Sequence, residues 1–166
     1  MKINIANIDD GLNRLELSEP SRELSLLDHG HLKGDIRVKL VIDKRLDDLN
    51  LKAKVVSSAE LVCDRCLIKF EKELVSNFKV YYSSKYSESE EQNTRRLSLN
   101  NPVINLLNDV RSSLVLSLPI KLLCEENCKG LCPNCGVNRN QQECECPTQQ
   151  IDSRWETLKS FQVTES

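Results

Sequence analysis

Eight cysteines limit what this chain can fold into, because they fall into four close pairs. Two form an isolated Cys-x-x-Cys, and the other six lie within residues 124–146. A structural zinc ion is held by four ligands in a tetrahedron, and short turns with paired cysteines supply these ligands two at a time. We therefore predict two structural Zn²⁺ sites, with the ligands Cys63, Cys66, Cys124, Cys128, Cys132, Cys135, Cys144 and Cys146.

The cellular compartment decides whether paired cysteines bind metal or form disulfides. The first twelve residues are rich in Asn and Asp and contain no apolar stretch typical of a secretory signal. No apolar run approaches the length that spans a bilayer. We therefore expect a cytoplasmic protein (or a stromal one, in a plastid), reduced thiols and no membrane partner. The alternatives are a disulfide scaffold and buried free thiols.

Four pairs can be combined into two sites in three ways, and loop closure favours the local combination. Gly136 follows a Cys-Pro-Asn-Cys turn and suits a zinc knuckle. The outer cluster of this combination consists of Cys132, Cys135, Cys144 and Cys146. The inner cluster then consists of Cys63, Cys66, Cys124 and Cys128. Four thiolates leave no position for water, so both zinc ions are expected to be structural.

Alternating apolar and polar residues predict strands over residues 33–82. Ile36, Val38 and Leu40 share one face in this pattern, with charged residues between them. The Cys-x-x-Cys at 63–66 lies between two such runs, which places it at a hairpin tip. Strands that are apolar on one side are typical of an antiparallel sheet with one face in water.

A helix is expected after the strands. Residues 83–100 are polar and predict a mobile surface loop. Asn101 and Pro102 suit the start of a helix, and apolar residues then recur at helical spacing as far as Leu118. Ser153 and Glu156 resemble a capping box and predict a short terminal helix docking on the sheet.

These elements predict an α+β fold. An antiparallel β-sheet with one long packing helix is expected over residues 1–118. A small cysteine-rich zinc-binding module is expected over residues 119–166. The apolar content of 39% implies a modest core, which metal sites can supplement.

Charge divides the predicted binding surfaces, although the whole chain carries only −2. Four cations on the polar side of the strands are candidates for contacting RNA phosphates: Arg37, Lys39, Lys52 and Lys54. Four carboxylates of the cysteine module are candidates for contacting a basic protein: Glu125, Glu126, Glu143 and Glu145. An ordinary solvated sheet face is the alternative for the cations. The low net charge slightly favours the protein partner.

The sequence offers no catalytic residue. It contains no phosphate-binding loop, dinucleotide fingerprint, metalloprotease motif or nucleophile elbow. We therefore expect no enzyme and no small-molecule substrate. A thiol oxidoreductase or a zinc- and thiol-based redox regulator is the alternative, but a thioredoxin-like pair is expected at a helix N-terminus rather than between strands.

Two separated motifs resemble those of the YceD family, the large ribosomal RNA subunit accumulation proteins of bacteria and plastids. The upstream motif is C-D-R-C-L. The downstream part reads D-V-R-S-S-L-V-L-S-L-P, then L-C-E-E-N-C-K-G-L-C-P-N-C-G-V-N-R-N, then C-E-C-P and D-S-R-W-x-x-L. The resemblance covers about residue 60 to the end of the chain and includes all eight cysteines as motif positions.

The resemblance implies a non-enzymatic factor needed for accumulation or processing of large-subunit ribosomal RNA. Its expected partners are a ribosomal precursor particle, through a basic ribosomal protein or the large-subunit RNA. The resemblance supplies no catalytic residue.

Overall fold

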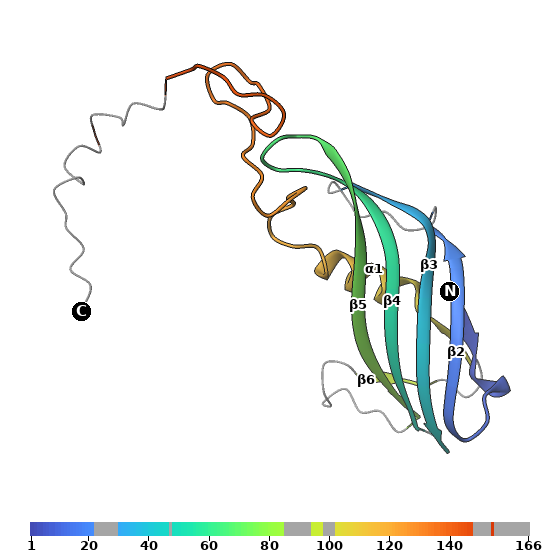
Figure 1. Cartoon of the computed structure of the whole chain (residues 1–166). Coiled ribbons are helices and arrows are strands. Elements are labelled where there is room, and N and C mark those ends of the chain that lie inside the picture. Colours follow the sequence, from blue (N-terminus) through green and yellow to red (C-terminus); the bar gives the residue numbers. More distant parts are fainter. Residues whose placement is uncertain (22–29, 47, 85–93, 98–101, 148–153, 155–166) are drawn as a thin grey trace.

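The computed structural model of the protein describes residues 1–21, 30–46, 48–84, 94–97, 102–147 and 154. Within these residues, one sheet has five strands in the order β2-β3-β4-β5-β6 (Figure 1). The strands are β2 (Gly11–Pro20), β3 (Gly30–Arg45), β4 (Asp48–Val62), β5 (Lys69–Ser83) and β6 (Thr94–Arg96). Neighbouring strands are antiparallel, except that β6 runs parallel to β5.

The three long strands confirm the alternating pattern of the sequence. Ile36, Val38 and Leu40 are almost fully buried, while the residues between them are exposed. Successive side chains of a strand point to opposite faces, so this pattern gives the sheet one apolar face and one wet face. The Cys-x-x-Cys at 63–66 forms the tip of the β4–β5 hairpin, as predicted.

A second, two-stranded sheet was not predicted. It pairs β1 (Lys2–Asn4) with β7 (Val103–Asn105), and a short 3₁₀ helix, η1 (Ile5–Asn7), follows β1. The predicted helix start at 101–102 is therefore wrong. Ile5 N–H donates to the Pro102 carbonyl at 2.7 Å, so this segment joins the N-terminus instead of beginning a helix.

The packing helix α1 runs from Leu107 to Leu116, which is shorter at both ends than predicted. Its N-cap residue is Leu106, which makes no side-chain cap hydrogen bond, and Asn105 Oδ1 accepts from Leu107 N–H at 3.1 Å. Asn101 lies outside the described residues, and so does the predicted terminal helix, apart from Arg154.

The predicted loop over 83–100 is partly corrected. Ser83 ends β5, and the strand β6 forms inside the polar stretch. Arg95 on β6 forms an ion pair with Asp109 of α1, with Nη1 2.8 Å from Oδ2. This ion pair fixes β6 next to the helix. The remaining parts of the stretch, 85–93 and 98–101, lie outside the described residues.

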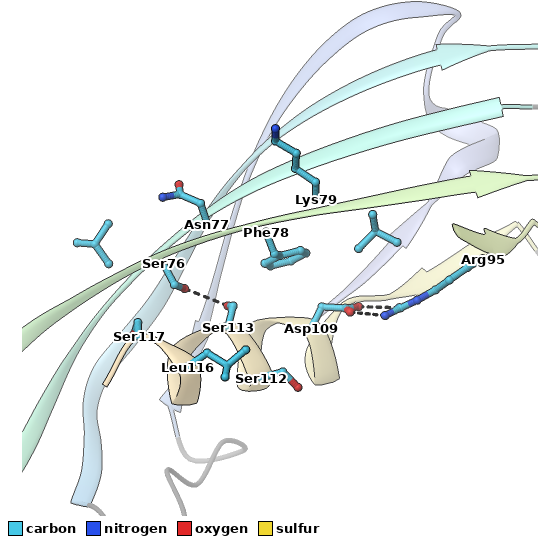
Figure 2. Close-up of a pocket in the computed structure, with 12 residues that line it drawn as sticks. Ser76, Asn77, Phe78, Lys79, Arg95, Asp109, Ser112, Ser113, Leu116 and Ser117 are labelled. Atoms are coloured by element: carbon cyan, nitrogen blue, oxygen red, sulfur yellow. Dashed lines mark hydrogen bonds and ion pairs between the residues drawn. The ribbon is translucent and has the colours of Figure 1, made fainter. Parts of the chain in front are cut away.

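The core lies between the apolar face of the five-stranded sheet and α1. Val110 and Leu114 of the helix are fully buried there. Ser76 of β5 donates a buried hydrogen bond to Ser113 of α1 at 3.0 Å, and Figure 2 shows these side chains pointing toward one another. A pocket of about 420 Å³ lies beside them, between β5 and α1. The helix therefore covers one face of the sheet and leaves the other face open.

Candidate metal centres and a basic sheet face

The cysteines gather into the two predicted groups. The sulfur atoms of the inner cluster lie within 4.8 Å of one another, and the same holds for the outer cluster. Four sulfurs at about 2.3 Å from a tetrahedral zinc ion are about 3.8 Å apart. In the inner cluster, Cys63 Sγ lies 3.8 Å from Cys128 Sγ, and Cys66 Sγ lies 3.6 Å from Cys124 Sγ. Both groups can therefore hold a metal ion, and the inner spacing matches a tetrahedral Zn²⁺ site.

Hydrogen bonds hold the hairpin tip to the C-terminal segment beside the inner cluster. Asp64 N–H donates to the Leu122 carbonyl at 2.7 Å, and Leu122 N–H donates to Asp64 Oδ2 at 2.7 Å. Arg65 Nη1 donates to the Cys128 carbonyl at 2.8 Å, and the Arg65 carbonyl accepts from Leu131 N–H at 3.0 Å. The two residues between the first cysteines thus dock the distant segment. Sequence reasoning missed them, although C-D-R-C places them at the tip.

The two Cys-x-x-Cys turns share one hydrogen-bond pattern. In the first turn, Cys63 N–H donates to the Ile68 carbonyl and Leu67 N–H donates to the Cys63 carbonyl, both at 2.9 Å. In the second, Cys132 N–H donates to the Val137 carbonyl at 2.8 Å, and Gly136 N–H donates to the Cys132 carbonyl at 2.9 Å. Leu67 and Gly136 occupy equivalent left-handed positions, with φ of 59° and 74°. Glycine adopts this conformation without strain, as predicted, whereas leucine does not.

Hydrogen bonds from backbone N–H groups lower the pKa of one thiol in each turn. Hydrogen bonds from Cys135 and Asn134 N–H lower the pKa of Cys132 to about 6. Burial raises the pKa of Cys63, but hydrogen bonds from backbone N–H groups, that of Cys124 first, outweigh it and lower this pKa to about 6. Cys63 and Cys132 are therefore the thiols that ionise most readily in the two turns.

The facing cysteines show the opposite trend. Burial and hydrogen bonds with neighbouring thiols raise the pKa of Cys124 to about 12. A hydrogen bond with Cys135, followed by burial, raises the pKa of Cys146 to about 12. Sulfur atoms this close oppose one another's ionisation, and a divalent cation at the centre offsets that repulsion. A metal ion bound at the centre would therefore favour ionisation of all four thiols in a cluster.

Asn140 connects the two clusters. It lies in the loop between the outer-cluster cysteines, yet its Nδ2 donates to Cys128 Sγ of the inner cluster at 3.3 Å. Its Oδ1 accepts from Lys129 N–H at 2.7 Å, and Nδ2 also donates to Asn138 Oδ1 at 2.8 Å. A hydrogen bond to a ligand sulfur orients that sulfur. The outer loop therefore supports the inner metal position.

The clusters differ in their exposure. Cys63, Cys66 and Cys128 are at most 3% exposed and pack against Phe70 and neighbouring apolar residues. In the outer cluster, Cys135 is exposed. The inner cluster thus belongs to the protein interior, while the outer cluster has contact with solvent.

A basic face covers the open side of the sheet. The four predicted cations are exposed there, and the register adds Arg14 and Lys79 to them. We define the basic face as Arg14, Arg37, Lys39, Lys52, Lys54 and Lys79. Lys39 lies directly opposite Lys54, and Lys52 lies directly opposite Lys79. Like charges in such cross-strand pairs destabilise a sheet.

Few carboxylates balance this surface. Among the described residues, Lys39 is the one member of the basic face with an ion pair, to Glu16 at 4.0 Å. The four predicted glutamates lie elsewhere, around the cysteines, and all are exposed: Glu125, Glu126, Glu143 and Glu145. The structure therefore separates a basic sheet face from an acidic cysteine module.

The chain is similar to known proteins along most of its length. Within the described residues, no helix is long and apolar enough to cross a membrane. The chain is 31% identical over 55 residues to the Arabidopsis thaliana protein "Large ribosomal RNA subunit accumulation protein YCED homolog 1, chloroplastic". That match covers 33% of this chain and 17% of the Arabidopsis protein.

The chain is also 29% identical, over 164 aligned positions, to uncharacterized proteins of Mycobacterium bovis and Mycobacterium tuberculosis. These matches cover 89% of this chain and 78% of each relative. No solved structure matches the chain. The family described as "Large ribosomal RNA subunit accumulation protein YceD" matches residues 51–162, which include both cysteine clusters. The chain therefore belongs to the YceD family.

Proposed function

We propose that this protein is a non-enzymatic ribosome-biogenesis factor that supports accumulation of large-subunit ribosomal RNA by binding precursor RNA through its basic face. The family description names the RNA. Binding through the basic face is supported by two pairs of lysines that face each other across strands, Lys39–Lys54 and Lys52–Lys79. Each pair costs stability in the free protein, and contact with RNA phosphates would remove that cost. It would act where ribosomes assemble, in the cytoplasm or the plastid stroma.

The cysteine clusters have a structural role in this proposal. Each offers four sulfur ligands, and a closed Zn²⁺ site has no open position for water or substrate. The inner cluster joins the β4–β5 hairpin to the C-terminal segment, so its metal would hold the module in place. A thiol oxidoreductase is less well supported, because Cys63 and Cys66 lie at a hairpin tip and face a second pair of cysteines.

The acidic cysteine module supports a second candidate, which is binding of a basic ribosomal protein. Four exposed glutamates surround the clusters, and each Zn(Cys)₄ centre would add two negative charges. We favour RNA nevertheless, because the register gathers six cations from four strands on one face.

Two charge-reversal variants separate these candidates. The sheet variant is Arg37→Glu with Lys39→Glu, Lys52→Glu and Lys54→Glu. The module variant is Glu125→Lys with Glu126→Lys, Glu143→Lys and Glu145→Lys. Each protein would be crosslinked in cells and purified with its bound RNA and protein. We expect the sheet variant to lose ribosomal RNA crosslinks and the module variant to retain them. If only the module variant lost its crosslinked ribosomal protein, binding of a basic ribosomal protein would be favoured instead. A wild-type protein that purifies without ribosomal precursor components would contradict the proposed function.

A further inference from the structure

The basic face extends over four strands, which defines the kind of RNA that it fits. One cross-strand row contains Arg14, Val41, Lys52 and Lys79, in that order from β2 to β5. The next row along the strands contains Glu16, Lys39, Lys54 and Asn77, in the same order. Neighbouring strands lie about 4.8 Å apart, so the first row is about 14 Å wide. Cations therefore spread in two dimensions instead of following a single line.

The side chains between the cations are not suited to stacking on bases. Val56 and Val75 lie in the row of Arg37, and Asn77 lies in the row of Lys39. In Figure 2, Asn77 and Lys79 point away from α1, toward the open side of the sheet. Among the described residues, the rows that carry the cations contain no aromatic side chain, and the adjoining row contains a single one, Tyr81.

Single-stranded and base-paired RNA are recognised by different chemistry. Surfaces that bind single strands stack unpaired bases on aromatic rings, usually beside cations. Base-paired RNA hides its bases, and proteins contact its phosphates and 2′-hydroxyl groups instead. The rows of the basic face contain cations, valines, Asn77, Ser18 and Glu16, so they offer contacts to a phosphate backbone and no row of aromatic rings for stacking bases.

We infer that the basic face binds the phosphate backbone of base-paired RNA, and that Arg14 and Lys79 take part in this contact. The inference rests on the proposed function, because it specifies the RNA that the same surface binds. Six phosphate contacts predict a slope of about −5 for the logarithm of affinity against the logarithm of salt concentration. Binding is expected to be insensitive to base sequence.

The test uses the full-length, metal-loaded protein and fluorescently labelled RNA. Affinity would be measured by anisotropy for a 16-base-pair RNA duplex and for each of its separate strands, at several salt concentrations. The test variant is Arg14→Ala with Lys79→Ala. The matched control is Arg111→Ala with Lys121→Ala, which also removes one arginine and one lysine, both exposed and outside the basic face.

We expect the duplex to bind more tightly than either strand. The test variant should weaken duplex binding and reduce the salt slope by about two, because two phosphate contacts are lost. The control should leave the slope unchanged. Thermal melting should show no loss of stability from the Lys79 change, because it removes the repulsion with Lys52.

Each contrary result has a separate meaning. Tighter binding to the single strands overturns the inference and leaves RNA binding intact. An unchanged slope in the test variant also overturns it, because Arg14 and Lys79 would then make no contact. A protein that binds no RNA yet purifies with ribosomal precursors overturns the inference and the proposed RNA binding, but not the role in ribosome biogenesis. Absence from those precursors is the result that contradicts the role in ribosome biogenesis itself.

Discussion

Replacing one cysteine of the inner cluster and replacing one of the outer cluster should each open a different part of the molecule. Cys63→Ser removes a ligand from the inner cluster, and Cys132→Ser removes one from the outer cluster. Elemental analysis of the wild-type protein should give about two zinc ions per chain, because each closed site holds one. We expect each variant to retain about one zinc ion.

The magnitude of the inner opening follows from the contacts at the hairpin tip. Without metal, the four hydrogen bonds of Asp64 and Arg65 and the burial of Leu122 in the core hold the segment around residues 120–131 there. Each hydrogen bond contributes about 1 kcal/mol and the buried leucine about 2 kcal/mol, or about 6 kcal/mol together. Fixing the backbone costs about 1 kcal/mol or more per residue, which for this segment exceeds 10 kcal/mol. The segment should therefore undock in Cys63→Ser.

Hydrogen exchange of individual N–H groups measures this difference. In Cys63→Ser, Leu122 and Leu131 N–H should exchange rapidly, because both donate to the hairpin tip. In Cys132→Ser, these two groups should stay protected, while Gly136 N–H in the outer turn should lose its protection. The N–H groups of β3 and β4 serve as the control and should remain protected in both variants. The same exchange pattern in both variants would refute the assignment of ligands to two separate sites.

Two further predictions concern single residues near the clusters. Asn140→Ala removes the hydrogen bond to Cys128 Sγ and should weaken the inner metal site about tenfold or more, as measured by competition with a chelator; unchanged inner-site affinity would show that the contact is dispensable. Gly136→Ala forces a side chain into a left-handed conformation and should destabilise the outer turn by about 1 kcal/mol in denaturant unfolding, whereas Leu67→Gly should stabilise the inner turn by a smaller amount. Stabilisation by Gly136→Ala would contradict the conformational argument.

The long strands could be predicted because their pattern is local. Each of β3, β4 and β5 alternates buried and exposed residues, and the sequence shows this directly. Strand β2 was missed because it lies at the sheet edge, where Leu12 and Leu15 are exposed and the alternation is weak. The β1–β7 pair was missed because residues 2–4 meet residues 103–105, a contact that no local signal reveals. That contact also displaced the predicted helix start.

In the candidate site, too, local patterns could be predicted from the sequence and long-range contacts could not. Cysteine spacing alone predicted the two clusters, and the structure brings the sulfurs together in that combination. The roles of Asp64 and Asn140 could not be read from the sequence, because their partners lie 58 and 12 positions away. Arg14 and Lys79 joined the basic face only through the strand register. Composition and spacing thus identify ligands, whereas long-range pairing identifies the residues that support them.

The chain order of the inner cluster has a consequence for synthesis. Cys63 and Cys66 leave the ribosome long before Cys124 and Cys128; the strands β2 to β4 precede the first pair, and β5 lies between the two pairs. During translation, the hairpin therefore presents half of a metal site on a sheet that already has its long strands. The second half arrives only after α1 has been made. Metal capture at this site would thus be a late event that secures a fold already in place, and the outer cluster would close last.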